Sequence, residues 1–220
     1  GSHKSIASIL KYDEKELKEP IHTIELVSNN FKGSKGVIGI IGAGNFTKMT
    51  LLPALKNSGA HLKYIASQGG LSSTLLAKKY GFARSTTNYK EILEDDEVDL
   101  VLITTRHNQH AEMVIESLNA GKNVFVEKPL ALNEEELERI IGAYRESGKT
   151  LTVGFNRRFS PHIEKIKSSI GEAQMNVVAT MNAGFISSNV WVHDMKTGGG
   201  RIIGEACHYI DLIIYLTGSR

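Results

Sequence analysis

Only one of the 220 residues is a cysteine, and the chain carries little excess charge of either sign. A single cysteine excludes an internal disulfide framework and fits a reducing compartment. The 26 basic and 24 acidic residues leave a formal net charge of +2 at pH 7. That balance is too even for the electrostatic footprint of a nucleic-acid-binding protein, so we expect no nucleic-acid partner.

Long apolar segments are also missing from the sequence. No run of about 18 apolar residues could span a bilayer, and no charged stretch followed by an apolar one has the form of a signal peptide. Gly1-Ser2-His3 is typical of what remains of a purification tag, so we expect the native N-terminus to lie outside this sequence. These absences favour a cytoplasmic protein with no membrane partner.

The residues that are present have the composition of a soluble globular protein, 41% hydrophobic and 23% charged. From Val37 to Phe155, apolar runs alternate with helical stretches that end at glycines. Strands are predicted from Val37 into the turn at Gly42 and over 61–66, 98–104, 123–126 and 150–155, and helices over 51–55, 72–80, 88–93, 110–120 and 133–147. This alternation predicts an α/β fold with a doubly wound parallel sheet of the Rossmann type.

The two flanks of this region have a different pattern. Residues 1–36 form a polar arm with one apolar run, 21–27, that could supply a single strand. Residues 156–220 predict a helix over 160–170, a half-exposed strand over 175–185, a loop over 187–200 and an apolar helix over 201–216. One strand and two helices make a poor independent core. We therefore expect a Rossmann domain at 37–155 and the incomplete start of an α/β open-sheet substrate domain at 156–220, in a fragment of a larger protein.

The most informative stretch is Val37–Phe46, VIGIIGAGNF, in which a buried strand leads into a glycine turn and a helix. Gly42 allows a tight turn, and Gly44 lets the backbone approach a pyrophosphate without a Cβ in the way. Asn45 could cap a helix whose free N–H groups face the phosphates. Thr47 occupies the third position of the fingerprint, where a glycine or alanine is usual, so its side chain must be absorbed between helix and strand. The alternative is a glycine turn that only connects strand to helix.

A lysine follows the predicted strand at 123–126, in the sequence Glu127-Lys128-Pro129. Ligands of open α/β sheets bind outside the carboxyl ends of the strands. The Lys128 ammonium could there polarise a hydroxyl or carbonyl oxygen, or relay a proton during hydride transfer. Taken alone, the motif is better explained by a surface ion pair before a loop.

Five segments together resemble a known family. They are IGAGNF, TTRHNQHAE, AGKNVFVEKPLAL, GFNRRFSP and GGGRIIGEACHYIDLIIYLTG, and they resemble the Gfo/Idh/MocA oxidoreductases, which pair a Rossmann domain with an open-sheet α/β domain. GFNRRFSP and GEACHYIDL are similar in particular to the form fused behind a zinc-type alcohol-dehydrogenase-like domain. On that analogy, residues 4–36 are the junction with an upstream domain.

The resemblance implies a bound NAD or NADP and hydride transfer between its nicotinamide and a secondary alcohol or ketone, of a sugar or nucleotide-sugar. Carried over residue by residue, it implies a pyrophosphate turn and a cleft for the nicotinamide. The implied cofactor-binding residues are Gly42, Gly44, Asn45, Phe46, Ser67, Gln68, Thr105, Arg106, His107, His110, Glu127, Lys128, Asn156 and Arg157. Arg106-His107 stands where the family often has Pro-Asn.

The family's proton-transfer residues match only in part. The resemblance implies that Lys128 stabilises the reacting oxygen and that His208, whose ordinary pKa lies near neutrality, moves the proton. The aspartate that commonly lies four residues before this histidine is replaced by Gly204. Glu205 or Asp211, each three residues away on a helix, could orient the ring instead. The alternative is a helix histidine satisfied by a neighbouring carboxylate.

The sequence gives a weak signal for the choice between NAD and NADP. A carboxylate that binds the ribose hydroxyls is expected about 20 residues beyond the glycine turn, but the strand there ends in Ala66-Ser67-Gln68-Gly69-Gly70. Neither a carboxylate for NAD nor an arginine for the 2′-phosphate of NADP is present. Ser67 and Gln68 could bind either nucleotide, and we expect NAD.

Other side chains have more ordinary explanations. His107 and His110 have the spacing of two metal ligands, but no cysteine or carboxylate cluster is near them in sequence, so we expect no metal. Cys207 beside His208 resembles a nucleophile pair, although neighbours on a helix do not face each other. Two further groups are candidates for substrate contacts: the arginines Arg157 and Arg158, and a loop with Trp191, His193 and Asp194 that could cover the cleft.

Two alternatives remain open on function. The same site could reduce an imine or another carbonyl that is not a sugar. The chain could also be a catalytically silent dinucleotide-binding module of a larger protein, which the glycine at 204 favours. Because the predicted substrate sheet is incomplete, we expect little or no catalysis by this chain alone, and its open strand edges favour association, as in a homo-oligomer.

Overall fold

The computed structural model describes residues 21–28, 31, 35–171 and 175–219. The first twenty residues of the predicted arm, and most of its linker to the sheet, lie outside this part of the chain. No helix within it is long and apolar enough to cross a membrane.

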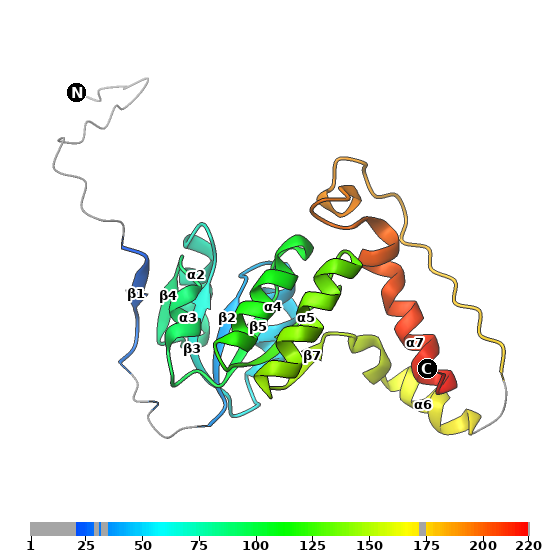
Figure 1. The fold of residues 1–220 in the computed structure, drawn as a ribbon, viewed down its shortest axis with the longest axis horizontal. Helices are drawn as coiled ribbons and strands as arrows, with labels where there is room; N and C mark the ends of the chain where they lie inside the picture. The colour runs from blue at the N-terminus through cyan, green and yellow to red at the C-terminus, as the bar shows by residue number, and fades with distance from the viewer. Residues whose placement is uncertain (1–20, 29–30, 32–34, 172–174, 220) are drawn as a thin grey trace, which may run out of the picture.

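A seven-stranded sheet forms the centre of the molecule, with β1 at one edge and β7 at the other (Figure 1). The strand order is β1-β4-β3-β2-β5-β6-β7. The strands are β1 Thr23–Glu25, β2 Val37–Ile41, β3 His61–Ala66, β4 Arg84–Thr86, β5 Leu100–Ile103, β6 Asn123–Val126 and β7 Leu151–Val153. All neighbours pair in parallel except β1, which is antiparallel to β4. The predicted doubly wound parallel sheet is confirmed.

Helices cover both faces of this sheet because its central strands are apolar on both sides. The helices of this region are α1 Leu52–Leu55, α2 Leu71–Tyr80, α3 Lys90–Glu94, α4 His110–Asn119 and α5 Glu134–Ser147, with a π-helical turn η1 at Thr47–Leu51. Every residue of β2 is buried. Val37 and Ile41 pack into the core under α3, α4 and α5, whereas Ile38 and Ile40 pack under α1 and α2. Alternate residues therefore fill opposite cores, as the period of a strand requires.

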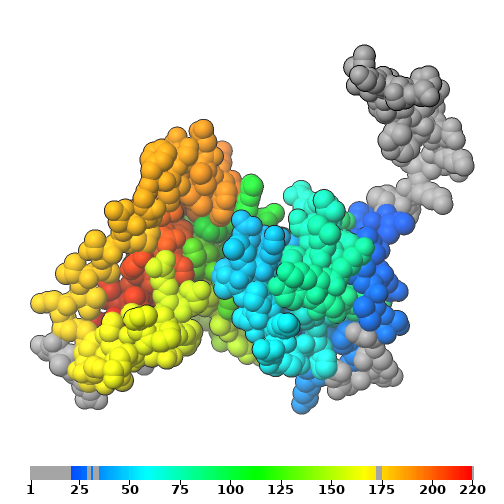
Figure 2. All heavy atoms as spheres, turned by 180° about the vertical axis from the view of Figure 1, so that it is seen from behind, coloured from blue at the N-terminus to red at the C-terminus, as the bar shows by residue number. Residues whose placement is uncertain are grey.

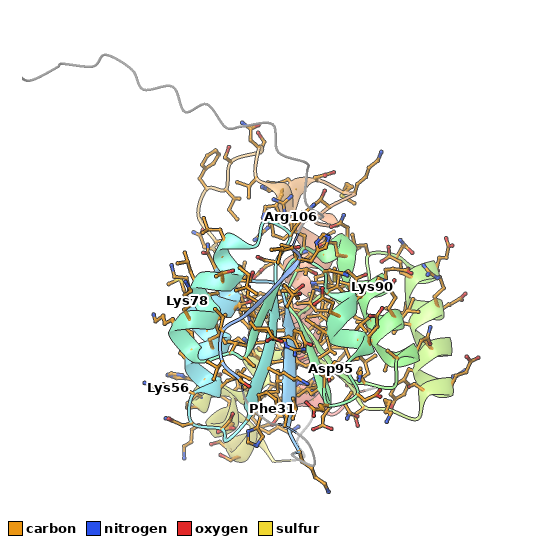
Figure 3. All side chains as sticks on the ribbon, turned by 90° about the vertical axis from the view of Figure 1, so that its left-hand side faces the viewer. Phe31, Lys56, Lys78, Lys90, Asp95 and Arg106 are labelled. Atoms are coloured by element: carbon orange, nitrogen blue, oxygen red, sulfur yellow. The ribbon has the colours of Figure 1, made fainter. Side chains whose placement is uncertain are left out.

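Polar side chains tie the strands together at the end of the sheet away from the cleft described below. Lys63 is 6% exposed, and its Nζ lies 2.6 Å from Asp95 Oδ2. The Tyr64 hydroxyl donates a hydrogen bond to the same Asp95 carboxylate at 2.9 Å. In Figure 3, Asp95 and Phe31 lie at this end and Arg106 at the opposite end. These buried charges are paired with one another, so we assign them to the fold.

The C-terminal part of the chain packs beyond β7 as α6, Pro161–Ile170, and α7, Cys207–Thr217 (Figure 1). A π-helical turn, η5 Ile202–Ala206, leads into α7. The Arg158 guanidinium pairs with Asp211 of α7, and Lys167 of α6 donates to the Tyr215 carbonyl oxygen at 2.6 Å. The predicted helices are present, and charged groups join them.

The predicted strand over 175–185 is wrong. This segment is extended without strand pairing, and it runs along the outer side of α7 (Figure 2). Val178 is 89% exposed and Phe185 is 93% exposed. The alternation of the sequence does not suffice because a strand needs a hydrogen-bonded neighbour, and no other strand of the described residues lies beside it.

Candidate active site

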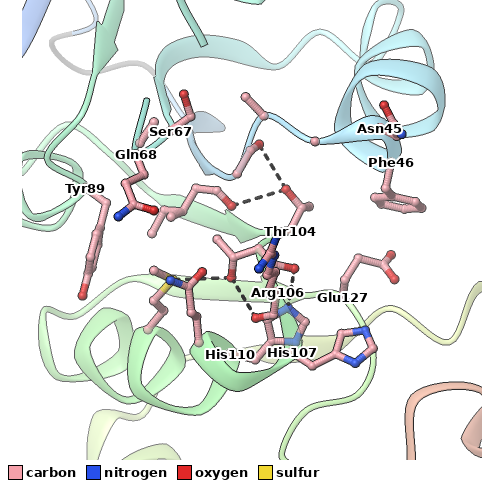
Figure 4. Close-up of a pocket in the computed structure, with 18 of the residues that line it drawn as sticks. Asn45, Phe46, Ser67, Gln68, Tyr89, Thr104, Arg106, His107, His110 and Glu127 are labelled. Atoms are coloured by element: carbon pink, nitrogen blue, oxygen red, sulfur yellow. Dashed lines mark hydrogen bonds between the residues drawn. The ribbon is translucent and has the colours of Figure 1, made fainter. Parts of the chain in front are cut away.

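A cleft of about 720 Å³ opens at the carboxyl ends of β2, β3, β5 and β6 (Figure 4). The chain leaves β2 toward β3 on one side and returns to β5 on the other, so the cleft lies at the switch point of the sheet. Twelve predicted site residues line it: Gly42, Gly44, Asn45, Phe46, Ser67, Gln68, Thr105, Arg106, His107, His110, Glu127 and Lys128. The other four do not, namely Asn156, Arg157, Glu205 and His208.

The glycine turn after β2 leaves its backbone open to this cleft. Gly42 has a φ of 116°, and a Cβ there would lie 2.6 Å from Thr104 Oγ1 and 2.8 Å from the Thr104 carbonyl. No side chain fits at that position. A Cβ on Gly44 would meet no atom within 4 Å, so its absence keeps the cleft side of the backbone free for a ligand.

The threonine at the third fingerprint position is part of this turn. Thr47 is completely buried. Its hydroxyl donates to the Gly42 carbonyl oxygen at 2.9 Å and lies 2.7 Å from Thr104 Oγ1. These polar contacts of the Thr47 hydroxyl therefore replace the close glycine contact that the fingerprint usually has. The prediction that the fold accommodates this side chain is confirmed.

The expected helix cap by Asn45 is wrong. The first intrahelical hydrogen bond runs from the Lys48 amide to the Gly44 carbonyl oxygen, at 3.0 Å. Gly44 therefore occupies the N-cap position and Asn45 is the first helical residue. No side chain caps this turn, which leaves its first N–H groups directed at the cleft.

The end of the cleft near β3 is lined by neutral side chains. Ser67, Gln68 and Tyr89 lie there (Figure 4), and Thr87 also lines the cleft. The Tyr89 hydroxyl donates a hydrogen bond to Glu116 Oε2, which lies outside the cleft, at 2.6 Å. Several lining side chains here and nearby were not predicted from the sequence: Thr87, Tyr89, Thr104, Gln109 and Met113. The signal for Thr87 and Tyr89 was their position just after β4, a three-residue strand that was itself not predicted.

At the opposite end, Lys128 joins the cleft to the C-terminal helix. Its Nζ donates to the Gly204 carbonyl oxygen at 2.7 Å and lies 3.8 Å from Glu205 Oε2. Glu205 also accepts a hydrogen bond from Arg157 Nη2 at 2.8 Å, and Arg157 Nη1 donates to the Tyr209 hydroxyl at 2.7 Å. The predicted residues Lys128, Glu205 and Arg157 therefore form one chain of contacts, although only Lys128 reaches the cleft.

Two titratable groups near Lys128 are enclosed without hydrogen-bond partners in the described structure. Glu127 Oε1 is one of them, and burial raises the pKa of this carboxyl to about 7 against the lowering effect of Lys128. His208 Nδ1 is the other. Burial first, and then the charges of Lys128 and Arg157, lower the pKa of His208 to about 4. His208 is therefore neutral at pH 7. It does not line the cleft.

Two other histidines are fixed by backbone carbonyl groups. His107 Nδ1 lies 2.8 Å from the Gly198 oxygen. His110 is fully buried, with Nδ1 at 2.8 Å from the Pro129 oxygen and Nε2 at 3.2 Å from the Thr105 oxygen. Their ring centroids are 5.8 Å apart. The described residues contain no group of three or more histidine, cysteine, aspartate or glutamate side chains that could hold a metal.

Of the loop expected to cover the cleft, only Trp191 lines it. Its ring packs edge-on against His107 with centroids 4.8 Å apart, and the Arg106 guanidinium lies 5.8 Å from it. The backbone N–H of Asn108 donates to the Thr197 carbonyl oxygen at 3.1 Å, and this hydrogen bond joins the loop to the Rossmann part.

Comparison with known proteins agrees with this geometry. Residues 37–155 match the family model described as the GFO_IDH_MocA oxidoreductase family, NAD-binding Rossmann fold. The chain belongs to the Gfo/Idh/MocA family. That match extends from the first residue of β2 to just beyond β7, so it contains the glycine turn and Lys128.

Individual members of the Gfo/Idh/MocA family match a larger share of the chain. The uncharacterized oxidoreductase YrbE of Bacillus subtilis (strain 168) is 30% identical over 84% of this chain and 54% of its own length. Inositol 2-dehydrogenase of Rhizobium meliloti (strain 1021) is 29% identical over 83% of this chain and 55% of its own. The structure of levoglucosan dehydrogenase in complex with NADH and levoglucosan superposes with a TM-score of 0.71 at 28% identity, over 83% of this chain and 54% of that one. The chain thus spans about half the length of the relatives it matches.

Proposed function

We propose that this Gfo/Idh/MocA chain supplies the dinucleotide site, and Lys128 as a catalytic group, of an NAD-dependent dehydrogenase of polyhydroxylated, sugar-like substrates. The observation that carries the proposal is the Lys128 ammonium, which lines the same cleft as the uncovered glycine turn. A bound nicotinamide would supply the hydride acceptor or donor. Two relatives are named for inositol and levoglucosan, both of which carry secondary alcohols.

The cleft fits a dinucleotide along its length. Gly42 and Gly44 leave room for a pyrophosphate at the start of a helix. Ser67 and Gln68 offer hydrogen bonds for a ribose without an opposing charge. The absence of a cationic side chain at that end leaves a 2′-phosphate without a charged partner among the described lining residues, which supports NAD over NADP.

Lys128 would act on the oxygen of the substrate. In oxidation an alcohol becomes a carbonyl, and negative charge builds up on oxygen as the proton leaves. An ammonium that donates a charge-assisted hydrogen bond to that oxygen stabilises the transition state more than the ground state. The hydrogen bond to the Gly204 carbonyl oxygen holds Nζ at the wall of the cleft, so the group is positioned before substrate binds.

Titration calorimetry tests the nucleotide site directly. We expect NAD to bind this chain with a micromolar dissociation constant, and NADP at least tenfold more weakly. Lys128→Met should bind NAD within about threefold of the wild type, yet in the full-length protein it should lose at least 100-fold in kcat on polyols. Lys149→Met, which removes an exposed lysine, is the control for the loss of one positive charge.

Two results would contradict the proposal. Failure of every nicotinamide nucleotide to bind would mean that the glycine turn is only structural. Tight binding by a full-length protein that turns over no alcohol or ketone would instead support a catalytically silent nucleotide-binding module, the alternative that the glycine at 204 favours.

A further inference from the structure

A glycine of the C-terminal region makes room for a histidine of the Rossmann part. A Cβ on Gly204 would lie 3.2 Å from His107 Cε1 and 3.5 Å from His107 Nδ1. The first of these distances is tighter than an ordinary contact, so any side chain at 204 would press on the imidazole. Lys128 Nζ donates to the carbonyl oxygen of the same glycine at 2.7 Å. The ammonium and the imidazole therefore meet at one residue, at the end of the cleft that both line.

The tautomer of His107 follows from its hydrogen bond. The Gly198 carbonyl oxygen can only accept, so Nδ1 at 2.8 Å must carry the hydrogen. The neutral ring then has its lone pair on Nε2. Among the described residues, Nε2 has no hydrogen-bond partner and is not one of the enclosed unpaired atoms. Because the side chain lines the cleft, this lone pair is available to a ligand there.

The other two histidines near Lys128 lack this combination. His110 has a backbone carbonyl oxygen beside each ring nitrogen, so neither faces a ligand. His208 does not line the cleft, and its Nδ1 is enclosed without a partner in the described structure. Of these three histidines, only His107 has both a tautomer fixed by a hydrogen bond at Nδ1 and a ring nitrogen without a partner among the described residues.

We propose that His107 is the group that exchanges a proton with the substrate oxygen beside Lys128, in place of His208. This inference rests on the proposed dehydrogenase function. In oxidation, the O–H bond of the alcohol breaks and its proton goes to His107 Nε2. The C–H bond breaks with its electron pair, which leaves as hydride for the oxidised nicotinamide, and the carbon–oxygen bond becomes a carbonyl. In reduction, the His107 imidazolium returns the proton.

Burial and the positive charges around His107 favour a neutral ring that can accept this proton. Burial is the main cause that lowers its pKa below the ordinary 6.5, and the charges of His110 and Lys128 lower it further. The hydrogen bond to the Gly198 carbonyl oxygen and the charge of Glu205 act in the opposite direction. Arg106, adjacent in sequence, also lines the cleft and adds positive charge there (Figure 4).

NMR pH titration of the histidine ring signals tests the inference without any turnover. The chain has 8 histidines, and the signals that disappear in His107→Asn and His208→Gln assign these two. Oxidised NAD carries a positive nicotinamide ring and reduced NAD does not. We expect the pKa of His107 to be lower by at least one unit with oxidised NAD than with reduced NAD, and that of His208 to change less. ADP-ribose, which lacks the nicotinamide, is the control for binding alone.

His107→Asn separates a proton-transfer role from a structural one. Its amide nitrogen can replace Nδ1 as the donor to the Gly198 carbonyl oxygen, but the side chain does not titrate. We expect NAD affinity within threefold of the wild type and a loss of at least 100-fold in kcat of the full-length protein, with KM little changed.

The outcomes distinguish this inference from the proposed function. If NAD binds but the pKa of His107 is the same with oxidised and with reduced NAD, the inference is wrong and the proposed dehydrogenase function stands. Full turnover by His107→Asn, with loss of turnover in His208→Gln, would do the same. If no nicotinamide nucleotide binds, the proposed function fails and the inference fails with it.

Discussion

The enclosed carboxyl group of Glu127 makes a specific prediction about stability. Its Oε1 has no hydrogen-bond partner among the described residues, and it lies close enough to Gly154 that a Cβ there would approach it to 2.7 Å. An ionised carboxylate in this position is costly because burial removes its water. We therefore expect Glu127→Gln to stabilise the nucleotide-free protein at alkaline pH more than at acid pH.

The magnitude follows from the two pKa values of Glu127. The carboxyl ionises at about 7 in the folded protein and near 4.5 in the unfolded chain. Between these values the folded state binds more protons than the unfolded state, so the wild type loses stability as the pH rises, at about 1.4 kcal/mol per unit. Over the whole window the loss is about 3 kcal/mol. Glutamine does not titrate, so the variant lacks this loss.

Urea unfolding at intervals between pH 4.5 and 8 measures the effect. The difference in the free energy of unfolding between Glu127→Gln and wild type should shift in favour of the variant by about 3 kcal/mol across this range. Glu138→Gln, at an exposed position of α5, is the control for the loss of one carboxylate. A difference that stays constant with pH would show that the carboxyl ionises alike in both states, and would refute the argument from burial.

Four further changes test other parts of the structure. His208 ionises at about 4 when folded against 6.5 when unfolded, so the wild type should lose up to about 3 kcal/mol as the pH falls through that window, and urea unfolding of His208→Gln should lack the loss. Gly42→Ala should abolish NAD binding in calorimetry and lower stability by at least about 2 kcal/mol, because its Cβ would overlap Thr104. Gly142→Ala, where a Cβ meets nothing within 4 Å, should instead stabilise α5 by about 1 kcal/mol. Ile140→Ala removes a side chain that is 1% exposed and should cost about 2–5 kcal/mol in thermal or urea unfolding.

The parts of the fold that could be predicted were those that depend on local pattern. β2 and β5 are apolar on both faces, and such runs indicate buried parallel strands without any knowledge of their neighbours. β4 has only three residues, Arg84, Ser85 and Thr86, and no hydrophobic pattern. Its place in the sheet comes from β1 and β3 on either side. The segment 175–185 shows the opposite case, in which the residues alternate as in a strand but find no partner strand in the part of the chain that the structure describes.

The candidate site likewise contains residues that could be predicted from local sequence pattern and residues that could not. The glycine turn and Lys128 directly follow apolar strands, so position in sequence indicates position at the cleft. Thr87 and Tyr89 were missed because β4 was missed. The contact between His107 and Gly204 joins residues that are far apart in the chain, and no local pattern indicates it. Whether an aspartate could stand at 204 depends on the ring that occupies the space, and only the fold provides that information.

The antiparallel edge strand β1 has a consequence for biosynthesis. His22 and Thr87, whose side chains lie 3.0 Å apart beside β1 and β4, are separated by 65 residues in sequence. At a synthesis rate of 5–20 residues per second, the segment that closes this edge emerges about 3 to 13 s before the strand on which it docks. The first strand of the sheet to be made can therefore pair only after β4 has been made, later than the pairing of β2 with β3 becomes possible.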